Sequence, residues 1–97
     1  MNLKIFKIHG YWLLVNKFMD WRRLQVFNEI ANFNSFTQAA ENLKKSQSTL
    51  SRDILFIEKR LGFKVFNRNI RGIKLTKKGF DLLLITREFF NKIQSFK

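Results

Sequence analysis

Six polar side chains lie within one short segment, and two of them are of the types that read DNA base pairs. The segment is Ser46–Arg52, with the sequence SQSTLSR. Gln and Arg side chains make paired hydrogen bonds to adenine and guanine edges in the major groove. At about 100° per residue, Gln47, Ser48, Ser51 and Arg52 share one arc of a helix. The pattern favours a helix that offers these groups to duplex DNA from its first turns, although an ordinary hydrated helix face would show the same arc.

The helix that would carry these side chains begins after Ser46 and ends at Gly62. The Ser46 hydroxyl can accept a hydrogen bond from a free backbone N–H of the first turn. Gly62 can adopt the left-handed conformation that ends helices. Between them, apolar residues follow at spacings of four, three and four, and form a stripe about 120° from the polar arc: Leu50, Ile54, Ile57 and Leu61. The sequence therefore predicts one helix with a buried face and a polar face.

Two shorter helices are expected before this one. Residues 20–33 show a helical apolar face, and Asp20 can serve as the N-cap. Ser35 and Gln38 have the spacing of a capping box, so a second helix should begin there. It carries two adjacent Ala residues, which let another helix approach closely. A short helix, a tight turn and a helix with polar groups in its first turns predict a helix-turn-helix.

A basic β-hairpin is expected after Gly62. Phe63–Phe66 and Ile73–Leu75 both alternate between apolar and other residues, and a connection that contains Gly joins them. The prediction places Arg68 and Arg71 at the tip. A cationic hairpin that follows a recognition helix is a wing, which can reach phosphates or the minor groove. The alternative interpretation is a hydrated basic turn with no binding role.

Positive charge is concentrated around these elements. The formal net charge is +12, and residues 44–78 hold nine of these charges, with eleven Lys and Arg against two acidic residues. Such a distribution points to a polyanionic partner. The chain has one His, no Cys and no glycine-rich phosphate loop, so we expect no enzyme activity, metal site or cofactor. The lack of Cys also permits a reducing compartment.

The C-terminal segment predicts a helix that pairs with another chain. Thr76 is its candidate N-cap, and apolar residues recur with helical spacing to the end of the chain. A helix this apolar must bury its face on its own domain or on a partner, and the small core of the domain favours a partner helix. The predicted dimerisation residues are Leu82, Ile85, Phe89, Ile93 and Phe96.

The chain length supports one small domain with two appended segments. We divide it into an N-terminal extension (1–18), a DNA-binding domain (19–75) and a linker or dimerisation helix (76–97). The apolar run in the extension is about five residues long, which is too short for a secretory signal or a membrane span. We therefore expect an extra element or a poorly ordered tail there.

From about Met19 to its C-terminus, the chain resembles the N-terminal DNA-binding domain of the LysR-type transcriptional regulators. The residues that carry the resemblance are Leu24 and Phe27 in the first helix, Ser35–Ala40 at the start of the second, Ser46, Gln47, Leu50–Arg52 and Ile54 in the third, and Glu58, Leu61, Gly62, Phe66, Arg68, Arg71, Gly72, Leu75, Thr76 and Gly79 beyond it. The resemblance implies a mainly α winged helix-turn-helix, with a three-helix core, a short β-hairpin wing and a long C-terminal linker helix.

The resemblance also implies a function and a location. It implies sequence-specific binding of double-stranded DNA, as a homodimer, to regulate transcription at the nucleoid in a bacterial cytoplasm. By the same resemblance, Gln47, Ser51 and Arg52 contact bases or nearby phosphates, and Arg71 lies on the wing. Combined with the polar arc and the basic hairpin, the candidate DNA-binding residues are Ser46, Gln47, Ser48, Thr49, Ser51, Arg52, Arg68, Arg71 and Lys74.

Three departures from the family pattern qualify these expectations. Ser48 stands where the family usually has Pro, so we expect binding with an altered sequence preference. Leu55 and Phe56 replace positions that are commonly polar, and Leu55 would either touch a thymine methyl or shield the interface. The chain also stops before the effector-binding domain of the family, so we expect it to bind no small-molecule inducer. It would then act alone or by pairing with a full-length regulator.

A different class of function stays open at this point. A basic amphipathic protein could bind nucleic acid without sequence preference, or bind an anionic membrane surface. The basic residues cluster on the inner helix and the hairpin, and do not flank a single apolar face, which argues against the membrane.

Overall fold

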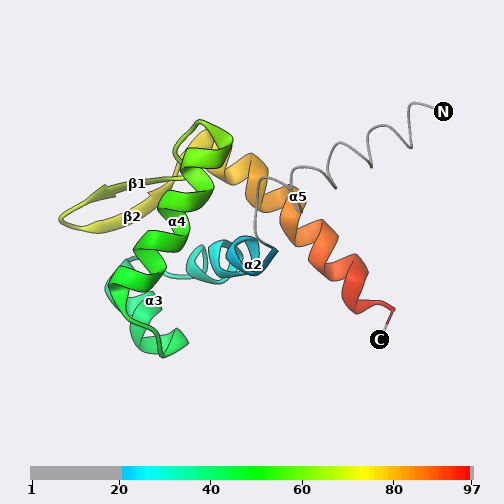
Figure 1. Cartoon of the computed structure of the whole chain (residues 1–97), viewed down its shortest axis with the longest axis horizontal. Helices are drawn as coiled ribbons and strands as arrows, with labels where there is room; N and C mark the ends of the chain where they lie inside the picture. Colours follow the sequence, from blue (N-terminus) through cyan, green and yellow to red (C-terminus); the bar gives the residue numbers. More distant parts are fainter. Residues whose placement is uncertain (1–20, 97) are drawn as a thin grey trace.

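A computed structural model describes residues 21–96, which form helices and one hairpin in the expected order (Figure 1). The elements are α2 (Trp21–Ile30), α3 (Phe36–Leu43), α4 (Gln47–Leu61), β1 (Phe66–Asn69), β2 (Gly72–Leu75) and α5 (Lys77–Gln94). This arrangement confirms the mainly α fold with a three-helix core, a short hairpin and a long last helix. The expectations for residues 1–18 and for the Asp20 cap lie outside the described residues.

The core lies where α4 packs against α2 and α3. Leu50, Ile54 and Ile57, from the predicted stripe of α4, are fully buried, and Leu61 is partly buried. Aromatic rings tie the hairpin to this core, since the centroids of the Phe27 and Phe66 rings are 5.5 Å apart. The apolar pattern of the sequence therefore predicted the buried face of α4.

The helix caps predicted within residues 21–96 are present. Ser35, Ser46 and Thr76 each accept a hydrogen bond from the backbone N–H three residues later, at 3.0, 3.1 and 2.9 Å. Gly62 ends α4 in the left-handed conformation, with φ of 81°. Lys44 also adopts a left-handed conformation and ends α3, which allows the chain to turn at once into α4. Local sequence signals thus set the boundaries of three helices.

The hairpin and its second strand are confirmed, but the predicted position of the first strand was wrong. The antiparallel pairs run from Phe66 opposite Leu75 to Asn69 opposite Gly72, so Phe63–Val65 precedes the strand. The Val65 N–H donates to the Glu58 carboxylate at 2.9 Å, which holds this segment against the end of α4. As a consequence, Arg68 lies within β1 and not at the tip.

A buried carboxylate that the sequence did not indicate joins α4 to α2. Only 4% of the Asp53 surface is exposed. Its Oδ1 accepts a hydrogen bond from Arg23 Nε at 3.1 Å and lies 3.6 Å from Arg22 Nη2. The Arg23 guanidinium also covers the Phe56 ring at 3.9 Å from its centroid. Burial of a carboxylate requires such charged partners.

The last helix uses one face for its own domain and leaves apolar side chains on the rest. Leu82 belongs to the core, which corrects its assignment as a dimerisation residue, because it faces the domain together with Leu83. Thr86 Oγ1 accepts a hydrogen bond from Asn28 Nδ2 at 2.6 Å and so ties α5 to α2. The exposed large apolar residues of α5 are Phe80, Leu84, Ile85, Phe89 and Ile93, and Phe96 is exposed just beyond its end. Within residues 21–96, no helix combines the length and the apolar character needed to cross a membrane.

We predict that Gly79→Ala destabilises the domain, although Ala favours helices. Gly79 lies in the first turn of α5, where an added Cβ would overlap the backbone carbonyl of Val65. Overpacking costs about 1–3 kcal/mol, and the better helix propensity of Ala returns about 1 kcal/mol. We expect a net loss of about 1 kcal/mol in the free energy of unfolding, measured by urea denaturation. Gly62→Asn is the control, because open space surrounds Gly62 and Asn tolerates its conformation. A raised midpoint for Gly79→Ala would contradict the packing argument.

Candidate nucleic-acid interface

The first turns of α4 present the predicted polar side chains to solvent. Gln47, Ser48, Thr49 and Arg52 are exposed, while Leu50 on the opposite side of the helix is fully buried. Within the described part of the chain, the Arg52 guanidinium makes no hydrogen bond or ion pair. Its donors are therefore available to a ligand.

The hydroxyl groups at the start of α4 are partly occupied by one another. Ser46 Oγ donates to Thr49 Oγ1 at 2.7 Å while it accepts the Thr49 N–H, and it lies 3.2 Å from Ser48 Oγ. Ser46 thus acts first as the cap of α4. The hydroxyl groups of Ser48 and Thr49 keep hydrogen-bonding capacity toward solvent.

Arg68 connects the hairpin to α4 and to α3 at the same time. Its Nη1 donates to Ser51 Oγ at 2.7 Å. Its guanidinium also lies over the Phe36 ring, 4.2 Å from the centroid. Both Arg68 and Ser51 were predicted as DNA contacts, and the structure brings them together as an internal pair. A planar guanidinium suits this double role because it can stack and donate together.

The end of β2 next to the turn is held by backbone contacts to the segment between α2 and α3. The Ile73 N–H donates to the Asn34 carbonyl at 2.8 Å. Gly72 has φ of 137°, and a Cβ at this position would overlap the same carbonyl oxygen. Only Gly fits a backbone approach this close. The hairpin is therefore fixed to the helix-turn-helix through β2 as well as through Arg68.

A shallow groove separates the start of α4 from the hairpin. Gln47 lines it on the α4 side, Ser35, Phe36 and Thr37 line it on the α3 side, and residues 68–73 close it. Ser35 and Thr37 were not among the predicted DNA contacts. The capping box could have indicated them, because it places Ser35 and Thr37 at the start of α3, the helix that precedes α4. The groove joins the polar arc and the hairpin into one continuous surface.

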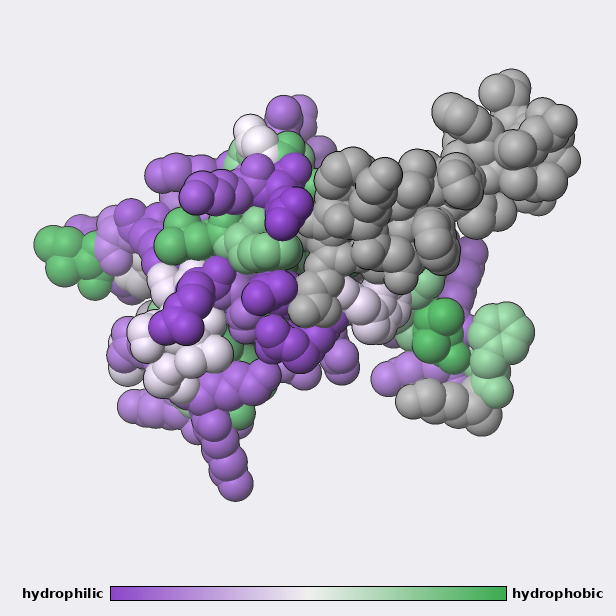
Figure 2. Space-filling view, viewed as in Figure 1, coloured by the Kyte–Doolittle hydropathy of each residue, from purple (hydrophilic) through white to green (hydrophobic). Residues whose placement is uncertain are grey.

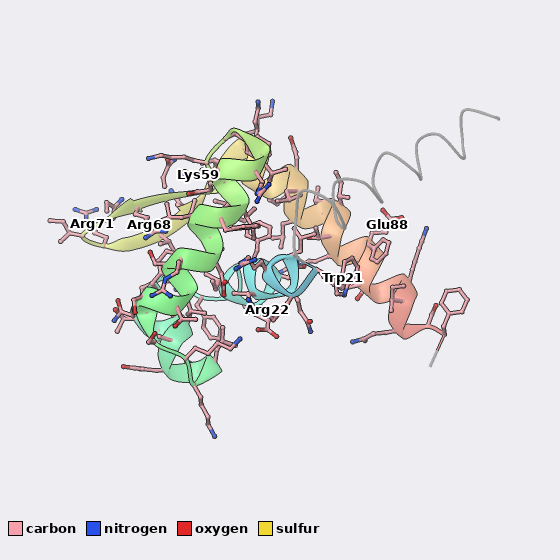
Figure 3. The ribbon with its side chains drawn as sticks, viewed as in Figure 1. Trp21, Arg22, Lys59, Arg68, Arg71 and Glu88 are labelled. Carbon is pink, nitrogen blue, oxygen red and sulfur yellow. The ribbon has the colours of Figure 1, made fainter. Side chains whose placement is uncertain are left out.

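Cationic side chains extend this surface along the hairpin. Arg71 lies at the tip, where Figure 3 shows it projecting away from the helices, and Lys74 is exposed on β2. Hydrophilic side chains also dominate the view over α3 and α4 in Figure 2. Among the described residues, no cluster of His, Cys, Asp or Glu could hold a metal ion. The arrangement can bind a polyanion by charge and hydrogen bonds.

This geometry defines the chain as a winged helix-turn-helix protein. A helix with an exposed polar start follows a second helix after a tight turn, and a basic hairpin lies beside it. The family model for bacterial regulatory helix-turn-helix proteins of the lysR family matches residues 21–80. The chain belongs to this family.

Individual relatives agree with this assignment. The chain is 36% identical over 77 residues to the HTH-type transcriptional activator AllS of Klebsiella pneumoniae, covering 79% of this chain and 28% of AllS. It is 39% identical over 70 residues to the glycine cleavage system transcriptional activator of Escherichia coli strain K12, covering 72% and 23% of the two chains. The chain thus spans about a quarter of the length of these relatives.

A solved structure supports the same fold. The crystal structure of the BenM_DBD/benA site 1 DNA complex matches with a TM-score of 0.74 and 29% identity. The match covers 80% of this chain and 91% of the BenM chain. That relative was solved with DNA.

Proposed function

We propose that this chain binds double-stranded DNA in a sequence-specific way and forms the DNA-binding part of a regulator of transcription. The observation that carries the proposal is the start of α4. Gln47 and Arg52 are exposed there, on a helix whose other face is fully buried in the core. Gln and Arg are the side chains that discriminate adenine and guanine edges. The DNA complex of a structural relative supports the same function.

The proposed interface gives different roles to the helix and to the hairpin. The start of α4 enters the major groove and reads bases, mainly through Gln47 and Arg52. The hairpin adds phosphate contacts through Arg71 and Lys74, which carry little sequence information. Arg68 and Ser51 contribute mainly by holding the two parts in place, since they pair with each other at 2.7 Å.

A second copy of this chain is the proposed partner of α5. Ile85, Phe89 and Ile93 are exposed and follow at spacings of four, so they share one side of α5, and Phe96 is exposed just beyond the end of the helix. Phe89 also contacts Trp21 of its own α2, with ring centroids 4.7 Å apart. A helix face that is apolar over about two turns, next to a further exposed Phe, needs a covering partner in water. Residues 19–75 then form the DNA-binding unit and 76–97 the dimerisation helix.

Selection from a random duplex pool tests the proposed function. We expect the protein to enrich one sequence, or two related half-sites, and the double variant Gln47→Ala, Arg52→Ala to enrich none at the same protein concentration. Circular dichroism should show the same helicity for both proteins, because both side chains are exposed. Equal enrichment of every sequence by the unmodified protein would reduce the function to non-specific binding.

A further inference from the structure

The tip of the hairpin carries an apolar side chain that is exposed to solvent. Ile70 is fully exposed, at 103% of the reference surface of the residue. It lies between β1 and β2, next to Arg71, in a hairpin that extends away from the helices (Figure 1). Figure 2 shows hydrophobic surface at this tip, with hydrophilic surface behind it.

The fold does not need an isoleucine at this position. Asn69 Oδ1 accepts a hydrogen bond from the Arg71 N–H at 2.8 Å, so the Asn69 side chain shapes the turn. Gly72 supplies the positive φ that the chain requires, and Ile70 has a negative φ. Turn positions favour Gly, Asn, Asp, Ser and Pro, whereas Ile contributes neither turn propensity nor burial here. The side chain at this position is therefore available to a partner of the hairpin.

The surroundings of Ile70 specify the chemistry of that partner. Arg71 is adjacent and Lys74 lies on the next strand, so the partner is anionic around an apolar contact. A hydrated phosphate offers nothing to an aliphatic side chain. The minor groove of duplex DNA offers both, because its deoxyribose walls are C–H surfaces between two rows of phosphates. The tip and Gln47 border the same groove of the protein, so DNA that docks on α4 also meets the tip.

We propose that Ile70 enters the minor groove beside Arg71 and selects against G·C base pairs there. This inference rests on the proposed function. In the minor groove, A·T pairs present only acceptors, while G·C pairs add the N2 amino group of guanine. An aliphatic side chain on the groove floor would desolvate this amino group without accepting its hydrogen bond, which is unfavourable. Arg71, next to Ile70 in the chain, binds the phosphates that border the groove and holds the tip there on any sequence.

The test uses inosine, which lacks the N2 amino group. An I·C pair presents the major-groove edge of G·C and the minor-groove edge of A·T. In the selected duplex, A·T, G·C and I·C are placed in turn at positions outside the bases read by Gln47 and Arg52. One position in each half-site should respond to these substitutions. There, we expect the full chain to bind the A·T and I·C duplexes equally and the G·C duplex about fivefold more weakly.

Two variants assign this preference to the side chain. Ile70→Leu keeps an aliphatic tip and should keep the fivefold ratio. Ile70→Asn should bind all three duplexes within twofold of one another, with an unchanged or higher melting temperature because Asn suits a turn. The inference is overturned if Ile70→Asn keeps the ratio, or if I·C behaves like G·C.

A membrane partner is tested in parallel with vesicles of phosphatidylcholine and phosphatidylserine. If Ile70→Asn weakens sedimentation with these vesicles and leaves the duplex ratios unchanged, the apolar tip serves a lipid surface and the inference is wrong. Failure of the protein to select any duplex sequence would overturn the proposed function, and the inference with it. A selected sequence with no minor-groove preference overturns the inference alone.

Discussion

Arg52→Ala should lower the affinity for the selected duplex by about 1–3 kcal/mol, with a much smaller loss on a scrambled duplex. The Arg52 guanidinium is exposed and has no partner within residues 21–96, so its removal leaves the domain intact. A bidentate contact to a guanine edge exists only at the correct base pair, and its loss therefore falls on the specific complex. Titrations of both duplexes by fluorescence anisotropy measure the difference.

Arg71→Ala is the matched control, because it also removes one exposed guanidinium. A cation beside the phosphates gains from counterion release on any sequence. We expect Arg71→Ala to weaken both duplexes by similar factors and to reduce the slope of log K against log salt by about one unit. If Arg52→Ala weakened both duplexes equally, and Arg71→Ala weakened only the specific one, the proposed roles of helix and hairpin would be reversed.

The double variant Ile85→Asp, Ile93→Asp should convert the proposed dimer to a monomer, with dimer affinity lowered by about 100-fold or more. Both side chains are exposed in the single chain, at 49% and 44%, so the substitutions spare the core. In a dimer they would place four carboxylates in an apolar seam, where each unpaired charge costs several kcal/mol. Sedimentation equilibrium over a range of protein concentrations gives the dissociation constant.

A charge-matched variant separates the seam from general repulsion. Asn91→Asp with Gln94→Glu adds the same two charges to α5, at exposed positions on a different side of the helix. We expect this variant to remain dimeric and to keep its affinity for a two-half-site duplex. A monomeric unmodified protein at high micromolar concentration would rule out the proposed role of α5.

Local signals made the helices predictable. Ser35, Ser46 and Thr76 each bind a backbone N–H within their own turn, so their role is visible in a stretch of four residues. The apolar stripe of α4 needed only helical periodicity. The general region of the interface followed from the same information, because the polar arc is fixed once the buried stripe is known.

Long-range packing could not be predicted in the same way. Arg68 and Ser51 are seventeen residues apart, and their pairing depends on where the hairpin docks. The Asp53 pair with Arg23 spans thirty residues, and nothing in either segment alone indicates it. Leu82 shares the apolar period of α5 with exposed residues, so periodicity could not tell which side of the helix meets the domain. The position of the first strand was missed because Glu58 binds the Val65 N–H, and alternation alone does not show this contact.

The rigid attachment of the hairpin has a mechanical consequence. The hydrogen bond from Ile73 to Asn34 and the close approach of Gly72 to the same carbonyl hold β2 against the helix-turn-helix. In the proposed complex, the protein therefore sets the distance between α4 in the major groove and the hairpin tip in the adjacent minor groove. The DNA must supply the adjustment, through its twist and groove width. Base steps that the protein never touches then influence affinity, because they decide how readily the duplex adopts the spacing between α4 and the hairpin tip.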